Sequence, residues 1–100
     1  MIDWQKHLIY ITNLIVCRDL ELPKLRAVKA KWREEDHTAC ISFYFDGAIT
    51  EEEKEEASDI CGGIIAHFPD GFLEENYIQW DYPKPLLESA FWAYKRDEQK

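Results

Sequence analysis

The sequence predicts an α+β domain in which two helices lie on one face of a mostly antiparallel sheet of three to four strands. Three observations support this fold class. Apolar residues recur at helical spacing in two segments, they alternate with polar residues in three others, and turn residues separate these segments. The predicted order is α-β-β-α-β with a further terminal strand, and a two-layer sandwich is the simplest way to bury the apolar faces.

The first helix is expected over residues 4–17. Asp3 is a suitable N-cap. The apolar residues that follow share one helical face: Trp4, Leu8, Ile11 and Ile15. A strand is the competing interpretation, because residues 8–16 are rich in isoleucine. The length of the segment and its capping residue favour the helix, which Pro23 then separates from the next element.

Two strands are expected at residues 25–33 and 39–45, joined as a β-hairpin by the polar residues 34–37. Asp46-Gly47 ends the second strand in a turn. One face of the hairpin is apolar and carries Val28, Ala30, Trp32, Ala39, Ile41, Phe43 and Phe45. The opposite face carries Lys29, Lys31, Arg33, Cys40, Ser42, Tyr44 and Asp46.

The second helix is expected over residues 51–68 and has the clearest local signal. Thr50 and Glu53 form a capping box, in which the hydroxyl accepts from the Glu53 amide and the carboxylate accepts from the Thr50 amide. Pro69 and Gly71 stop the helix. Gly62-Gly63 inside it is locally unfavourable by roughly 1 kcal/mol per glycine. Close backbone approach and a kink both remain as explanations.

A third strand is expected at residues 76–82, where Ile78, Trp80 and Tyr82 alternate with Tyr77, Gln79 and Asp81. Pro83 and Pro85 end it, because neither can donate to a sheet ladder. Residues 90–96 fit a short fourth strand, and a helix from about Leu86 is the alternative. Residues 97–100 are expected to fray.

Length and composition predict one domain over residues 1–100, because a chain this short has little room for two cores. Twenty acidic against twelve basic residues leave a net charge of −8, which repels nucleic acids and anionic membranes and complements a basic partner. The three cysteines show no paired motif and are expected as small core residues. No signal-peptide pattern is present, so the expected location is the cytoplasm.

Enzyme chemistry is not predicted. No spacing places a nucleophile beside a base or gathers metal ligands, and His7, His37 and His67 are spread over separate segments. Gly62-Gly63 lacks the Lys-Ser/Thr of a phosphate loop. We therefore expect no catalytic residues, no metal and no cofactor, and a protein that works by binding.

Two surfaces are candidates for that binding. The first is the acidic side of the helix over residues 51–68, with Glu52, Glu55, Glu56 and Asp59. The second is the sheet face turned away from the helices, which is expected to carry Tyr44 and Asp46 beside Tyr77, Gln79 and Asp81. A solvated helix face and ordinary sheet decoration are the alternatives without function.

Several motifs carry a resemblance to known proteins: Phe43-Tyr44-Phe45-Asp46-Gly47, then Glu51-Glu52 and Ala57-Ser58-Asp59, and the run from Tyr77 to Leu86. Over residues 25–95 the chain resembles the immunity proteins of polymorphic and contact-dependent growth inhibition toxins. The resemblance implies a cytosolic antidote that binds the C-terminal domain of a cognate toxin, often a nuclease. It implies no catalytic residues.

The favoured hypothesis is therefore an immunity protein that occludes the substrate-binding surface of a basic nuclease domain. An acidic binder suits a protein that must hold phosphates. The alternatives are a small acidic homo-oligomer, paired through the outer sheet face or an edge strand, and a small enzyme with an unrecognised site.

Overall fold

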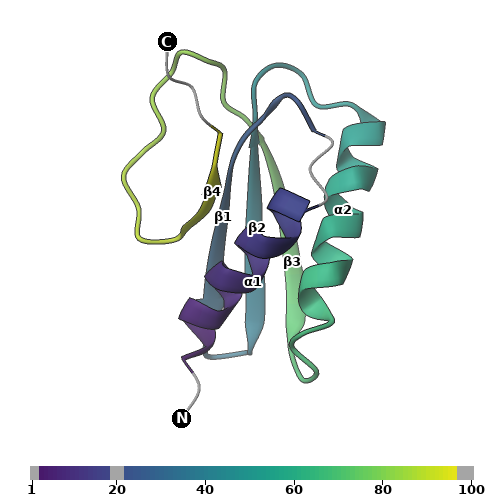
Figure 1. Cartoon of the computed structure of the whole chain (residues 1–100), viewed down its shortest axis with the longest axis vertical. Helices are drawn as coiled ribbons and strands as arrows, with labels where there is room; N and C mark the ends of the chain where they lie inside the picture. The colour runs from purple at the N-terminus through teal and green to yellow at the C-terminus, as the bar shows by residue number, and fades with distance from the viewer. Residues whose placement is uncertain (1–2, 19–21, 97–100) are drawn as a thin grey trace.

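Two helices pack on one face of a four-stranded mixed sheet in the computed structural model, which describes residues 3–18 and 22–96 (Figure 1). The α+β class and the two-layer arrangement are confirmed. The predicted fraying of residues 97–100 lies outside the described residues. The elements are α1 (Trp4–Arg18), β1 (Leu25–Arg33), β2 (Thr38–Phe45), α2 (Glu51–Ile65), β3 (Phe72–Gln79) and β4 (Trp92–Lys95).

The strand order is β3-β2-β1-β4. β1 pairs antiparallel with β2, its partner in the hairpin, and also with the terminal strand β4. β2 and β3 run parallel, because α2 crosses over between them and returns the chain to the same end of the sheet. α1 covers β1 and β4, and α2 covers β2 and β3.

The local signals at both helix starts are confirmed. The Lys6 amide donates to Asp3 Oδ1 over 3.1 Å, and the apolar face of α1 is buried at Leu8 and Ile15. At α2 both hydrogen bonds of the Thr50–Glu53 capping box are present. These contacts satisfy backbone donors that a helix start otherwise leaves free.

α2 ends at Ile65, three residues before the predicted end. It runs through both glycines without a break. A Cβ on Gly63 would stand 3.7 Å from the Ile15 side chain of α1, and one on Gly62 would meet nothing within 4 Å. Both positions have room for the Cβ of alanine, so nothing in the structure explains why they are glycines.

The hairpin has the predicted alternation, with Ala30, Ile41, Phe43 and Phe45 fully buried under the helices. Gly47 ends β2 with φ 94°, a conformation that glycine adopts without strain. A β-bulge interrupts the pairing between Leu25 and Ala27. The bulge matters below because it re-aims the intervening residue.

The prediction for β3 is wrong in its bounds and in its alternation. The strand begins and ends earlier than expected, and the residues expected to face inward and outward are exchanged at Tyr77 and Ile78. Tyr77 lies opposite Phe43 in the parallel register and stacks on it under α2, with ring centroids 5.9 Å apart. Ile78 lies opposite Tyr44 and therefore faces outward. The apolar residues misled the prediction, since the outer face of this sheet is itself lined with aromatic side chains.

β4 is a short strand at Trp92–Lys95, so the strand interpretation is confirmed over the helix. The cysteine prediction holds only in part. Cys61 is buried in the core, whereas Cys40 is half-buried and Cys17 is exposed. In the described ranges, no helix is long and apolar enough to cross a membrane.

Candidate partner-binding surfaces

The predicted acidic residues of α2 lie together on its surface and will be called the acidic face: Glu52, Glu55, Glu56 and Asp59. Their spacing is that of one helical side. Neighbouring acids have cations of their own, since Lys24 pairs with Glu53 at 3.3 Å and Lys54 with Glu51 at 3.6 Å. Within residues 3–18 and 22–96, no ion pair or hydrogen bond engages the side chains of the acidic face.

The acidic face carries a cost to helix stability. Glu52 and Glu56 stand four residues apart, as do Glu55 and Asp59. Like charges at this spacing destabilise a helix by roughly 0.2–0.5 kcal/mol per pair. A cation bound at the acidic face would relieve this repulsion.

The outer sheet face holds an array of aromatic rings and lysines that will be called the outer aromatic face: Lys29, Tyr44, Trp80, Lys84 and Trp92. Tyr44 meets Trp92 and Trp80 edge-on, with centroids 5.1 and 6.1 Å apart. The Lys29 ammonium stands 4.9 Å from the Trp92 ring, and that of Lys84 stands 4.0 Å from the Trp80 ring. The prediction that Tyr44 faces outward is confirmed.

The charge of this face differs from the prediction. We expected acids between the tyrosines, and the face instead has lysines between tyrosine and tryptophan rings. Of the acids that were assigned to this face, Asp46 and Asp81 both accept hydrogen bonds from backbone amides of the same chain. Among the described residues, the carboxylates of the acidic face of α2 are therefore unpaired, and the ammonium groups lie on the opposite side of the sheet.

Tyr77 does not belong to the outer face. Its hydroxyl donates to Glu75, whose other carboxylate oxygen accepts from the Ser58 hydroxyl of α2 at 3.3 Å. Burial, and then the hydrogen bond to Glu75, raise the pKa of the Tyr77 hydroxyl above its ordinary value. Glu75 thus links Tyr77 of β3 to Ser58 of α2. Gln79, exposed at the end of β3, donates to Asp81.

The carboxylates of Asp46 and Asp81 accept hydrogen bonds from other parts of the same chain. Asp46 Oδ1 accepts from the Tyr82 amide at 3.0 Å, and Asp81 Oδ1 accepts from the Gly47 amide at 2.8 Å. The two bonds tie the end of β2 to the chain after β3, just before the cis Tyr82–Pro83 peptide. A structural role is therefore established for both acids, and partner binding by them stays a prediction.

The Asp81 contact gives the fold a pH dependence. Hydrogen bonds from the backbone amide of Gly47, and then from the side-chain amide of Gln79, hold the pKa of the Asp81 carboxyl below its usual 3.8. The unfolded chain therefore takes up this proton first as the pH falls. The stabilisation is complete above pH 3.8 and is lost as the pH drops through 3.8 toward the folded-state pKa.

We accordingly expect Asp81→Asn to lower the urea midpoint at pH 7 and to lose less stability than the parent between pH 7 and pH 3. Urea unfolding followed by tryptophan fluorescence at both pH values measures this difference. If the parent and the variant lose the same stability over that interval, Asp81 is not a source of the pH dependence.

Arg26 is a structural residue that the sequence did not reveal. It sits in the β-bulge of β1, and only 2% of its surface is exposed. Its Nη1 donates to the carbonyl oxygens of Trp80 and Lys84 at 2.8 and 2.7 Å, and its guanidinium lies 5.6 Å from the centre of the Tyr82 ring. Arg26 thus holds the segment that supports the outer aromatic face.

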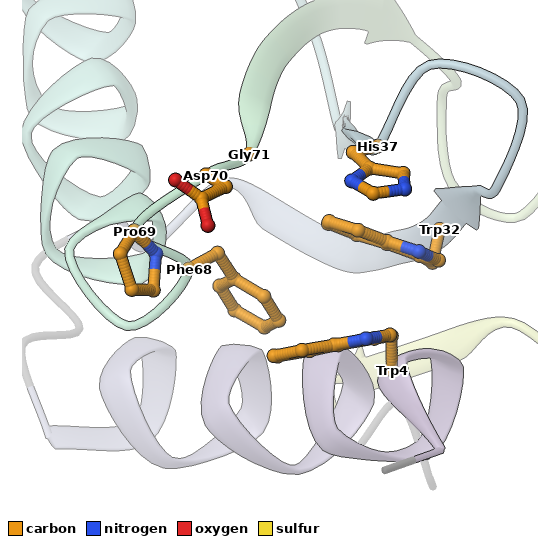
Figure 2. Close-up of a pocket in the computed structure, with 7 residues that line it drawn as sticks. All are labelled: Trp4, Trp32, His37, Phe68, Pro69, Asp70 and Gly71. Carbon is orange, nitrogen blue, oxygen red and sulfur yellow. The ribbon is translucent and has the colours of Figure 1, made fainter. Parts of the chain in front are cut away.

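An aromatic pocket opens where the start of α1, the end of β1 and the turn after α2 meet (Figure 2). It has a volume of about 160 Å³. Sequence patterns did not predict this pocket, because its lining residues are far apart along the chain. Its lining consists of Trp4, Trp32, His37, Phe68, Pro69, Asp70 and Gly71.

Within residues 3–18 and 22–96, the histidines and acids do not assemble a metal centre. Over the described part of the chain, no three His, Cys, Asp or Glu side chains are placed to hold an ion together. His7 and His37 instead border the aromatic rings, with His7 5.2 Å from Phe68 and His37 6.0 Å from Trp32. The surfaces described above are suited to protein contact.

Comparison with known proteins places the chain in a family. The model of the MafI2 immunity protein family matches residues 22–98, a segment that includes all four strands and α2 and leaves α1 outside. No curated protein matches the chain. The family match agrees with the toxin-immunity resemblance of the strand, turn and capped-helix motifs. The chain belongs to the MafI2 immunity protein family.

Proposed function

We propose that this immunity protein neutralises its cognate toxin by binding a basic nuclease domain with the acidic face of α2. The observation that carries the proposal is the contrast within α2. Glu51 and Glu53 are paired with lysines, whereas Glu52, Glu55, Glu56 and Asp59 have no cation within the described residues. The unpaired carboxylates are available to a basic surface.

A nuclease supplies such a surface, because it must neutralise phosphates to hold its substrate. Carboxylates presented by a rigid helix would occupy the same lysines and arginines. The binding alone then blocks the toxin by occluding its substrate-binding surface, with no catalytic step by the immunity protein. Electrostatic attraction would also raise the rate of association, which favours an antidote that must act before its toxin does. We place this encounter in the cytoplasm.

The outer aromatic face is the second region that we propose for toxin contact. Tyrosine and tryptophan dominate interface energetics, because they combine a large apolar area with a hydrogen-bonding tip. Tyr44 is central to this face, since both tryptophan rings meet it. Tyr44→Ala removes those contacts and leaves the acidic face unchanged, so the variant separates the two regions.

Co-expression with the product of the adjacent upstream gene tests the proposal. We expect a stable complex, relief of that protein's toxicity, and an association rate that falls as NaCl rises from about 0.05 M to about 0.5 M, because salt screens the charges. Size-exclusion chromatography, growth curves and stopped-flow fluorescence measure the three effects. A complex whose association is independent of salt would contradict the acidic-face mechanism, and unrelieved toxicity would contradict the choice of partner.

A further inference from the structure

The aromatic pocket brings together rings from three separate parts of the chain. Trp32 of β1 stacks on Trp4 of α1 and on Phe68 of the turn after α2, with centroids 5.8 and 5.4 Å apart. Trp4 also meets Phe68 at 5.6 Å. These contacts fix the pocket wall before any ligand arrives, so binding would order few side chains.

The rim of the pocket is negatively charged. Figure 2 shows the Asp70 carboxylate beside the hollow that the Trp32 and Phe68 rings and the His37 imidazole border. Asp70 is exposed and has no hydrogen bond or ion pair within the described residues. Glu34, in the β1–β2 turn, stands 3.8 Å from the His37 imidazole but does not line the pocket.

Two features of the pocket oppose stability. The Trp32 indole N–H is buried without a hydrogen-bond acceptor in the described part of the chain, which lowers the stability of the fold. His37 has φ 52°, in the left-handed region that non-glycine residues rarely adopt. Strain of this kind concentrates at binding sites.

We propose that this pocket binds a cationic side chain, the guanidinium of arginine or the ammonium of lysine, from the partner protein. Aromatic rings attract such a cation through their π faces, and the Asp70 carboxylate supplies the opposite charge. The volume of about 160 Å³ has room for roughly five water-sized groups, enough for the cationic head. The identity of the partner as toxin rests on the proposed function, whereas the pocket chemistry can be tested without it.

The test is an NMR titration of the ¹⁵N-labelled chain with N-acetyl-arginine amide at constant ionic strength. We expect saturable shifts of the Trp4 and Trp32 indole N–H signals in the millimolar range. Trp80 and Trp92, on the outer aromatic face, serve as internal references and should not move with them. N-acetyl-citrulline amide, the neutral isostere, is expected to bind at least about tenfold more weakly, because it lacks the charge.

Asp70→Asn is the decisive variant, because it keeps the shape of an exposed side chain and removes its charge. We expect it to weaken arginine amide binding about fivefold. Glu88→Gln, which also removes one charge from an exposed side chain and lies outside the pocket and the acidic face, is the control and should leave the affinity unchanged. Equal binding of citrulline amide, or unchanged affinity in Asp70→Asn, would overturn the inference. Neither result would bear on toxin binding by the acidic face.

Discussion

Glu55→Lys combined with Glu56→Lys is expected to slow toxin association at least about tenfold at low salt while the fold becomes slightly more stable. The two effects have opposite signs for a physical reason. Lysines at these positions replace the repulsion within α2 by attraction to Glu51, Glu52 and Asp59. The same lysines would face the cations of a basic toxin surface and repel them.

The experiment compares stopped-flow association rates with urea unfolding of the free chain. Glu35→Lys combined with Glu88→Lys is the matched control, because both pairs of changes take the net charge from −8 to −4. The control residues are exposed and lie off α2, so we expect a much smaller loss of rate. Equal losses in the two variants would mean that net charge, and not the acidic face, governs association. The difference should shrink as salt rises.

Local sequence signals predicted most of the fold. Asp3 and the Thr50–Glu53 capping box located both helix starts, because capping depends on residues within one turn. The alternation of apolar residues located the hairpin, since one of its faces is buried by the helices. The acidic face of α2 was predictable for the same reason, because helical spacing alone decides which side chains share a side.

The features that sequence did not reveal depend on contacts between distant segments. Tyr77 was assigned to the outer face, because Ile78 and Trp80 look like core residues. Only the register with Phe43 shows that Tyr77 turns inward. The aromatic pocket likewise depends on a contact between Trp4 and Phe68, and no spacing along the chain predicts that contact.

Arg26 is the most consequential of these non-local residues for stability. Alternation from Val28 backward would put its side chain on the apolar face, and the β-bulge changes its direction. The guanidinium then satisfies two carbonyl oxygens, those of Trp80 and Lys84, through short hydrogen bonds. A charged group buried in this way is tolerated only while its partners remain in place. The segment after β3 and the arginine therefore depend on each other.

Arg26→Met is expected to lower the free energy of unfolding by about 3 kcal/mol, because it keeps most of the side-chain volume and leaves both carbonyl oxygens without a donor. For a domain of this size that loss corresponds to a fall in Tm of roughly 12–24 °C by calorimetry. Arg33→Met, in the same strand, is the matched control. Arg33 is 41% exposed and pairs with Asp36 at the surface, so its loss should cost at most about 1 kcal/mol. Similar Tm values for the two variants would show that Asp46 and Asp81 hold the segment without Arg26.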